Sequence, residues 1–223
     1  MPNKQQQIEE QTKVLLFDTE TSGFITKSLP CDHQNQGWCI QLGAILTTEE
    51  VEIDRLNLLI KPNGRTQHPK AFETHKISLE YAEENGLNEW EVIDKFGRLM
   101  READIIICHN YDFDWQYVYH MMERNVDKMS DEARSAFYLD LPYFCTMKDK
   151  NIGKFVGAKN KNGKAKWPKL IELYEKISSY HEELFNAPWE FANEFNSEVA
   201  HDALDDIIAT SRCYFKLKEW QII

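Results

Sequence analysis

Carboxylates are concentrated in three segments that lie far apart in this 223-residue sequence: FDTET at 17–21, HNYDFD at 109–114 and HDALDD at 201–206. Taken singly, an acid after a strand is usually a turn residue, and Asp or Asn at the start of a helix is usually a cap. Together they allow another interpretation, because carboxylate oxygens are the ligands that Mg²⁺ and Mn²⁺ prefer. The three segments are therefore candidates for one metal site.

The first segment contains the clearest pair of acids. Asp18 and Glu20 lie two residues apart on an extended segment, so their side chains project from the same face of a strand. An exposed strand edge would be the ordinary explanation, but the preceding residues 14–17 (VLLF) are all apolar and draw the pair inward. Two buried like charges repel each other unless a cation lies between them, which favours a divalent metal at Asp18 and Glu20.

Helix geometry constrains the third segment. Inside one helix, a separation of five residues would turn His201 and Asp206 about 140° apart. If Asp202 is the N-cap and Asp205 lies near the third helical position, His201 falls on the preceding loop and can turn toward the site that Asp206 faces. A lone histidine is more often a surface or hydrogen-bonded residue, so His201 depends on the other two segments.

Hydrophobic periodicity predicts the elements that must position these segments. Short apolar runs predict strands at 14–17, 40–47, 56–60 and 105–108, with a strand-like piece at 138–145. Helical spacing predicts helices at 71–75, 79–85, 89–101, 111–124, 168–177 and 203–220. The order predicts an α/β fold in which an antiparallel meander and later strands form a mixed five-stranded sheet flanked by helices, with the 105–108 strand parallel to its neighbour.

In this order, FDTETSG, HNYDFD and HDALDD resemble the three exonuclease motifs of the DEDDh (DnaQ-like) family, which has the ribonuclease H-like fold. The resemblance covers roughly residues 14–214, and shorter similarities at 41–44, 75–78 and 145–147 support it. His201 indicates the DEDDh class, because a tyrosine four residues before the last aspartate marks the sister subfamily.

The resemblance implies a 3′–5′ exonuclease that uses two divalent metal ions, Mg²⁺ or Mn²⁺, to hydrolyse phosphodiester bonds. Asp18, Glu20 and Asp206 would hold one ion, Asp18 would bridge to the second, and Asp114 would support the second through its side chain or a bound water. His201 would take the proton of the attacking water as general base.

Three other acids in these motifs, Asp112, Asp202 and Asp205, do not match functional positions of the family. We expect them to be dispensable for metal binding.

The same resemblance implies that the backbone around Thr21, Ser22 and Gly23, with the side chain of Phe24, holds the 3′-terminal nucleotide. Phe24 could stack on a base, with packing in the core as the alternative. The favoured substrate is the 3′ end of single-stranded or frayed DNA, from which the enzyme would release nucleoside monophosphates in proofreading or repair. A DNA polymerase or another replication or repair protein is the implied partner. Residues 24–38 and 181–199 match no motif and leave substrate preference open.

Charge is distributed unevenly along the chain, whose formal net charge is −11. Residues 148–169 contain eight lysines and one acid, so this window carries +7 and the remainder −18. Glycines and asparagines among the lysines predict a flexible loop in the middle, and a solvated loop tip is the ordinary interpretation. An anionic enzyme that acts on a polyanion needs local cations, so Lys159, Lys161, Lys164 and Lys166 are candidates to guide the phosphate backbone.

Other functions stay open beside DNA hydrolysis. The five motif residues do not distinguish DNA from RNA, so RNA 3′-end trimming is one alternative. A non-catalytic nucleic-acid-binding module with the same fold is another, although all five positions are intact. A metal-dependent hydrolase of small phosphate compounds would leave the lysines unexplained. The overall negative charge disfavours a protein that coats nucleic acid through a broad basic surface.

Composition predicts one globular domain at 13–223 after a polar tail at 1–12, since 42% of residues are hydrophobic and no internal repeat is visible. The start lacks the pattern of a secretory signal, and no apolar stretch has the length of a membrane span, so we expect a cytoplasmic protein without a membrane partner. Five scattered cysteines fit reduced thiols. Cys31, His33 and Cys39 lack a fourth metal ligand at a familiar spacing, which favours a loop without metal.

Overall fold

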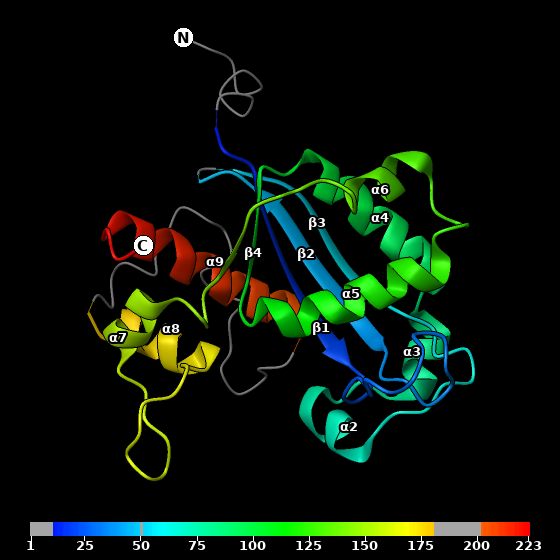
Figure 1. Cartoon of the computed structure of the whole chain (residues 1–223), viewed down its shortest axis with the longest axis horizontal. Helices are drawn as coiled ribbons and strands as arrows, with labels where there is room; N and C mark the ends of the chain where they lie inside the picture. Colours follow the sequence, from blue (N-terminus) through cyan, green and yellow to red (C-terminus); the bar gives the residue numbers. More distant parts are fainter. Residues whose placement is uncertain (1–10, 50, 181–201) are drawn as a thin grey trace.

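The structure is a computed structural model, and it describes residues 11–49, 51–180 and 202–223. Within these residues, five strands form a sheet in the order β3-β2-β1-β4-β5 (Figure 1). The strands are β1 (Val14–Thr21), β2 (Cys39–Thr47), β3 (Glu52–Leu59), β4 (Ile105–Cys108) and β5 (Tyr143–Cys145). β2 pairs antiparallel with β1 and β3, whereas β4 pairs parallel with β1 and β5. The predicted meander, the parallel fourth strand and the mixed five-stranded sheet are confirmed.

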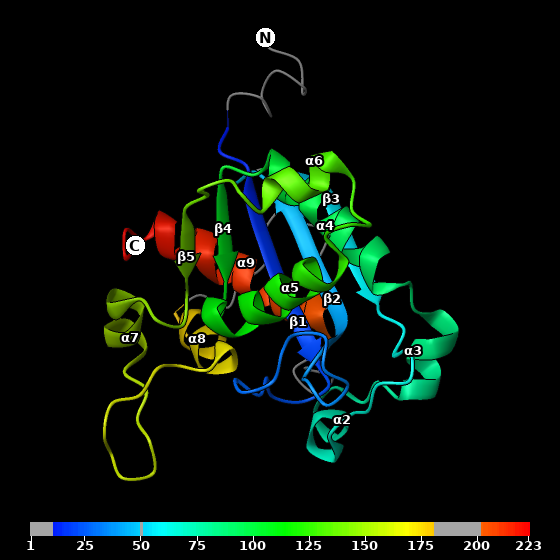
Figure 2. The same ribbon diagram turned by 45° about the vertical axis from the view of Figure 1, so that its right-hand side comes forward.

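Helices cover both faces of this sheet (Figures 1 and 2). The described helices are α2 (Pro69–His75), α3 (Leu79–Asn85), α4 (Glu89–Glu102), α5 (Tyr111–Asn125), α6 (Asp131–Ala136), α7 (Lys150–Val156), α8 (Leu170–Ser178) and α9 (Ala203–Glu219). α4 and α5 pack on one face in the largest hydrophobic cluster. α9 packs on the opposite face and also joins α7 and α8 in a smaller cluster.

The central strand β1 alternates between these two cores. Leu15 and Phe17 are buried among residues of α4 and α5, whereas Val14 and Leu16 are buried against α9. Because successive side chains of a strand point to opposite faces, the even-numbered positions continue toward α9. This alternation directs Asp18 and Glu20 toward α9 and Thr19 toward α5.

Gly43 of β2 lets α9 approach the sheet closely beside Asp18, its partner in the β1–β2 register. A Cβ atom at Gly43 would lie 2.6 Å from the Ile207 Cδ1 atom and 3.0 Å from the backbone carbonyl carbon of Ala203, both on α9. The Ile207 methyl can rotate away, but the Ala203 backbone moves only if the whole helix start moves. The absence of a side chain at 43 therefore sets the distance between Asp18 and the first turn of α9.

We expect Gly43→Val to displace the start of α9, which carries Asp206. Overpacking of this kind typically lowers the free energy of unfolding by about 1–3 kcal/mol, and a catalytic group misplaced by about 1 Å can lower kcat about 10²-fold. Thermal unfolding and single-strand hydrolysis would measure the two effects, with Gly43→Ala intermediate. Gly153→Ala is a matched control, since a Cβ there would meet only the Trp167 ring at 3.5 Å. A Gly43→Val protein with unchanged kcat would contradict this role.

The predicted strand at 138–145 is wrong in its first half, because β5 contains only Tyr143–Cys145. The backbone N–H groups of Tyr138 and Leu139 donate to the carbonyls of Ser135 and Ala136, which extends the turn that ends α6. α6 itself was not predicted. Ser130 caps it by accepting from the Ala133 N–H, so a serine followed by two acids was the available signal.

Helix α7, at the start of the lysine-rich stretch 148–169, was not predicted. Asp149 caps it by accepting from the backbone N–H groups of Asn151 and Ile152. The middle is a tight hairpin in which Lys159 pairs with Ala165 across an isolated bridge. Cap recognition would have found α7, but the lysine-rich composition favoured a loop.

Candidate metal centre

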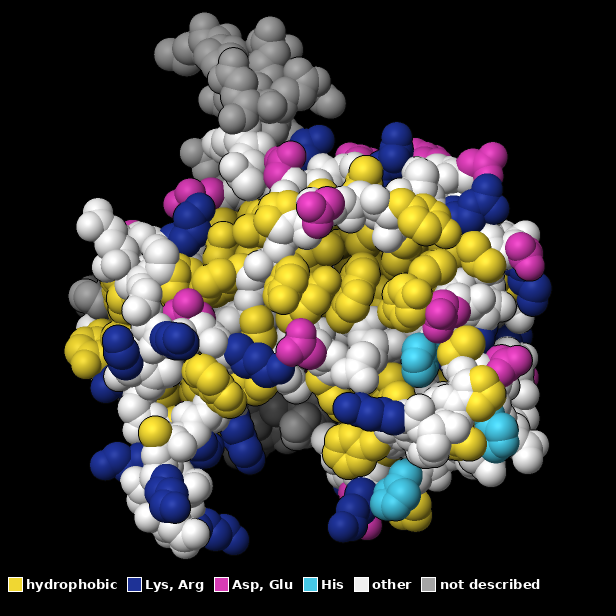
Figure 3. Space-filling view, viewed as in Figure 1, with side chains coloured by type: hydrophobic (Ala, Val, Ile, Leu, Met, Phe, Trp, Pro, Cys, Tyr) yellow, Lys and Arg dark blue, Asp and Glu magenta, His cyan; other side chains and the backbone are white. Residues whose placement is uncertain are grey.

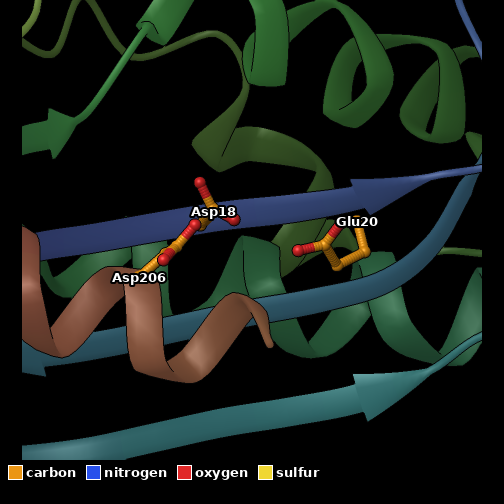
Figure 4. A group of neighbouring side chains, drawn as sticks. All are labelled: Asp18, Glu20 and Asp206. Atoms are coloured by element: carbon orange, nitrogen blue, oxygen red, sulfur yellow. The ribbon is translucent and has the colours of Figure 1, made fainter. Parts of the chain in front are cut away.

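Three of the predicted carboxylates converge at the end of β1. Asp18 and Glu20 of β1 and Asp206 of α9 each place one carboxylate oxygen within 4.8 Å of the others. Figure 4 shows Asp206 directed from α9 toward Asp18, with Glu20 further along the strand on the same side. Glu20 is 8% exposed, and Asp18 and Asp206 are half-buried. Residues 188 positions apart in the sequence thus form one compact acidic group.

Asp114 lies next to this group but makes different contacts. Its Oδ1 atom accepts hydrogen bonds from the Thr19 backbone N–H at 3.2 Å and from the Thr19 hydroxyl at 2.6 Å. Its Oδ2 atom accepts from the Cys108 thiol at 3.4 Å. Asp114 therefore approaches β1 from the α5 face, and it is not among the three carboxylates within 4.8 Å. Its predicted support of a second ion stays a prediction.

Burial raises the pKa values of all four carboxylates, and neighbouring acids add to the shift at Asp18, Glu20 and Asp206. Burial and, second, the charge of Asp114 raise the pKa of Asp18 well above its usual value. Burial and the charge of Asp206 raise the pKa of Glu20 to about 9. Burial raises the pKa of Asp114 to about 7, against the hydrogen bonds from Thr19 and Cys108. Burial and the charge of Asp205 raise the pKa of Asp206 to about 6.

Such a group needs positive charge to stay ionised at neutral pH. Within residues 11–49, 51–180 and 202–223, no Lys or Arg forms an ion pair with Asp18, Glu20, Asp114 or Asp206. A donor set of closely spaced carboxylate oxygens fits Mg²⁺ or Mn²⁺ and does not fit soft metals, which take thiolate or imidazole. The residues present therefore fit the divalent metal that the motifs imply.

Asp202 has a structural role, as predicted for the N-cap of α9. Its carboxylate accepts hydrogen bonds from the Leu204 N–H at 2.9 Å, the Gln41 side-chain amide at 2.8 Å and the Asn57 side-chain amide at 3.3 Å. It thereby joins the start of α9 to β2 and β3. Gln41 and Asn57 were not predicted as site residues. His201 lies outside the described residues.

The predicted substrate-binding residues follow β1. Thr21 ends the strand, and the Ser22 backbone N–H donates to the Trp38 carbonyl while the Ser22 carbonyl accepts from the His68 N–H. The Ser22 hydroxyl accepts from the Trp38 N–H at 3.0 Å, so this side chain holds the loop in place. The Gly23 carbonyl accepts from the Tyr117 hydroxyl at 2.8 Å, and Gly23 has φ 144°, in the region that favours glycine.

Phe24 does not pack in the core, because 85% of its surface is exposed. Its ring meets Phe113 of α5 edge-on, with ring centroids 6.2 Å apart. The core-packing alternative is therefore wrong. The exposed ring is compatible with the predicted contact to the 3′-terminal base, which stays a prediction.

Two side chains that were not predicted as functional stabilise the conformation of the loop at residues 24–38. Gln36 is buried, and its amide exchanges hydrogen bonds with the Thr26 backbone at 2.7 and 3.1 Å. Arg124 of α5 donates to the Cys31 carbonyl at 2.8 Å and pairs with buried Glu89 at 2.6 Å. No motif identified these residues, because a buried glutamine and a distant ion pair leave no local pattern.

The four candidate lysines are not equivalent. Lys159, Lys161 and Lys164 are exposed, and none of them forms an ion pair with a described residue. Lys166 is half-buried and donates to both carboxylate oxygens of Glu172 at 2.7 Å. Its charge is already compensated, which weakens the case for Lys166 as a phosphate ligand.

None of the described helices is long and apolar enough to cross a membrane.

The sequence matches the family described as DNA polymerase family B, exonuclease domain, over residues 1–173. The matched range includes Asp18, Glu20 and Asp114 and ends before the third acidic segment. No curated protein matches the chain.

Solved structures of exonuclease I share the fold. Escherichia coli exonuclease I in complex with a dA16 oligonucleotide aligns with a TM-score of 0.68 and 20% identity, covering 95% of this chain and 42% of that chain. Exonuclease I from Methylocaldum szegediense aligns with a TM-score of 0.63 and 18% identity, covering 94% and 41%. This chain thus spans less than half the length of these proteins. At such identities the likeness shows the fold, and the predicted ribonuclease H-like fold is confirmed.

Proposed function

The chain belongs to the family of DNA polymerase family B exonuclease domains and is therefore an exonuclease, and we propose that it removes nucleotides from the 3′ end of single-stranded or frayed DNA by two-metal-ion hydrolysis. The convergence of Asp18, Glu20 and Asp206 within 4.8 Å carries this proposal. The family name supports hydrolysis of DNA, and the carboxylate group supports a metal-dependent reaction.

The choice of single-stranded substrate draws on the structural relatives. Two of the similar exonuclease I structures contain single-stranded dA16 and dT13 oligonucleotides. In this chain, exposed Phe24 beside the loop that follows β1 supports stacking on a terminal base. A DNA polymerase or another replication or repair protein stays the proposed partner, on the family description alone.

Each site residue has a distinct task in the proposed reaction. Asp18, Glu20 and Asp206 would hold one divalent ion, Asp18 would also serve the second, and Asp114 would support the second through its side chain or a bound water. Bound as a pair, such ions stabilise the attacking and leaving oxygens of an in-line phosphodiester hydrolysis. His201 accepts a proton from the attacking water, and a neutral imidazole serves this purpose near pH 7. The loop at residues 21–24 orients the terminal nucleotide.

Degradation of matched 5′-labelled DNA and RNA oligomers tests the proposal. With Mg²⁺ or Mn²⁺ we expect a DNA ladder that shortens from the 3′ end and is lost with EDTA. A faster RNA ladder would replace DNA by RNA as the substrate. The absence of cleavage of both oligomers with both metals would refute the proposal and favour a binding module or a hydrolase of small phosphate compounds.

We expect His201→Gln to lower kcat about 10²-fold, since a positioned general base typically contributes at least that factor. Gln can still form hydrogen bonds but cannot accept a proton at neutral pH. Mn²⁺ affinity, measured by calorimetry, should stay unchanged because the carboxylates are intact. His33→Gln, at a half-buried histidine in the loop before β2, is the matched control. Equal activity of His201→Gln and wild type would exclude His201 as the base.

A further inference from the structure

Residues 158–166, here called the lysine hairpin, form a compact projection between α7 and α8. The Lys166 N–H donates to the Ala158 carbonyl at 3.0 Å, and the Asn160 N–H donates to the Lys164 carbonyl at 2.8 Å. The Asn160 side chain accepts from the N–H groups of Asn162 and Lys164 at 2.9 and 3.0 Å. These bonds give the turn a defined shape, with Gly163 at φ 74°.

The lysine hairpin carries concentrated positive charge on an acidic protein. Lys159, Lys161 and Lys164 are exposed, as are Lys154 of α7 and Lys169 before α8. Within the described chain, none of these five lysines forms an ion pair. A polyanion is the partner that such charge attracts, because the remainder of the chain repels it.

Trp167 adds an aromatic surface at the base of the lysine hairpin. It is 47% exposed. Its six-membered ring lies over Gly153 of α7, where an added Cβ would be 3.5 Å away. None of the ring–ring contacts of the described residues involves Trp167. The indole is thus supported by α7 on one side while much of its surface is open to a ligand.

The lysine hairpin and the metal centre lie toward the same end of the molecule. In both ribbon views the hairpin projects on the side to which the C-terminal end of β1 points (Figures 1 and 2). Figure 3 shows Lys and Arg side chains gathered on this projection, with a hollow between it and the part that contains α2. A strand whose 3′ end lies at the metal centre can therefore extend toward the hairpin.

We propose that the lysine hairpin and Trp167 form a second binding site for single-stranded DNA, which holds nucleotides several positions to the 5′ side of the scissile bond. Cations for phosphates combined with an open aromatic ring for a base are the features of single-strand sites without sequence preference. This inference rests on the proposed 3′-end hydrolysis at the carboxylates. It predicts dependence on substrate length, because a short oligomer reaches the metal centre without reaching Trp167.

Hydrolysis of a long and a short oligomer by the full chain tests the inference. For a single strand of about 20 nucleotides, we expect Trp167→Ala to raise KM about tenfold with kcat unchanged, as loss of one stacked base would. For a trinucleotide, KM should equal that of wild type. Trp167→Phe should retain most of the affinity, and Trp90→Ala, at another exposed tryptophan, is the matched control. The proposal would be overturned if Trp167→Ala and Trp90→Ala had equal KM values for the long strand. It would also be overturned if Trp167→Ala raised KM for the trinucleotide as much as for the long strand.

The charge contribution has a separate readout. Replacing Lys159, Lys161 and Lys164 with Ser should raise KM for the long strand and flatten its dependence on salt. Unchanged salt dependence would remove the lysines from the site. Base stacking on Trp167 requires unpaired bases. If Trp167→Ala weakened the binding of a blunt duplex as much as the binding of a single strand, base stacking would be excluded.

Direct binding separates this inference from the proposed function. Anisotropy of the labelled long strand can be measured in EDTA, where hydrolysis does not occur. Weaker binding by Trp167→Ala would support the lysine hairpin site even if the protein proved not to cleave DNA. Conversely, DNA cleavage with identical binding by wild type and Trp167→Ala would keep the proposed function and refute the second site.

Discussion

Asp18→Asn is expected to abolish hydrolysis and, at the same time, to make the metal-free protein more stable. Asp18 lies at the centre of the acidic group, where burial and then the charges of Asp114, Asp206 and Glu20 raise its pKa. Asparagine has nearly the same shape but cannot bridge two cations. We expect kcat to fall about 10³-fold or more, beyond the loss typical of a single stabilising group.

The gain in stability has an electrostatic cause. In the absence of metal, desolvation and the neighbouring like charges destabilise the ionised form of Asp18, whereas the Asn amide can donate hydrogen bonds to Glu20 or Asp206. We expect the free energy of unfolding at pH 8 to rise by about 1–3 kcal/mol. Chemical unfolding in EDTA measures this change, and saturating Mg²⁺ should remove the advantage.

Asp112→Asn provides the matched control, because Asp112 lies in the second acidic segment but is exposed and pairs with Lys148. We expect activity close to that of wild type and little change in stability. An Asp18→Asn protein that still shortens DNA at a comparable rate would show that the acidic group is not the catalytic centre. Equal loss of activity in both variants would indicate a general effect of the substitution.

Metal-free wild-type protein is expected to lose stability as pH rises from 5 to 9, and divalent metal should reverse this trend. Unfolded Asp and Glu titrate near pH 4. The folded pKa values are raised to about 6 for Asp206, about 7 for Asp114 and about 9 for Glu20. The folded protein therefore binds more protons than the unfolded chain, so its extra stability is present at low pH and disappears as pH rises through these values.

The combined effect is large because several groups contribute. We expect the free energy of unfolding in EDTA to fall by about 3 kcal/mol or more between pH 5 and pH 9. Mg²⁺ at about 100 times its Kd should add about 2.7 kcal/mol. This gain should grow with pH, because protons compete with the metal for the carboxylates.

Thermal or urea unfolding across this pH range, with and without metal, checks the prediction. Glu20→Gln is the informative variant, because it removes the group with the pKa of about 9. Its metal-free stability should depend less on pH above pH 7 than that of wild type. Stability of wild-type protein in EDTA that rises from pH 7 to pH 9 would contradict raised carboxylate pKa values.

The amino-acid sequence by itself determined the elements with strong local patterns. The apolar run at 14–17, the period-two relation of Asp18 and Glu20, and the N-cap at Asp202 were all readable, because strand alternation and helix capping act over a few residues. Local patterns were insufficient where they conflicted with composition. The lysine-rich composition of residues 148–169 obscured the signal of α7. The apolar residues at 138–145 suggested a strand longer than β5. The strand is shorter because the backbone N–H groups of Tyr138 and Leu139 form turn hydrogen bonds to α6.

Only the tertiary structure decided how the site is assembled. It brought Asp206 to Asp18 through the close approach of α9 over Gly43, and it placed Asp114 on the opposite face of β1 with its oxygens bonded to Thr19 and Cys108. In the folded protein the Phe24 ring is exposed, and the charge of Lys166 is paired with that of Glu172. The physical reason is that burial, like-charge repulsion and ion pairing depend on which distant residues become neighbours in space, and sequence spacing does not record that. Residue types and local periodicity therefore specified which groups the chain carries, and packing specified which of them act together.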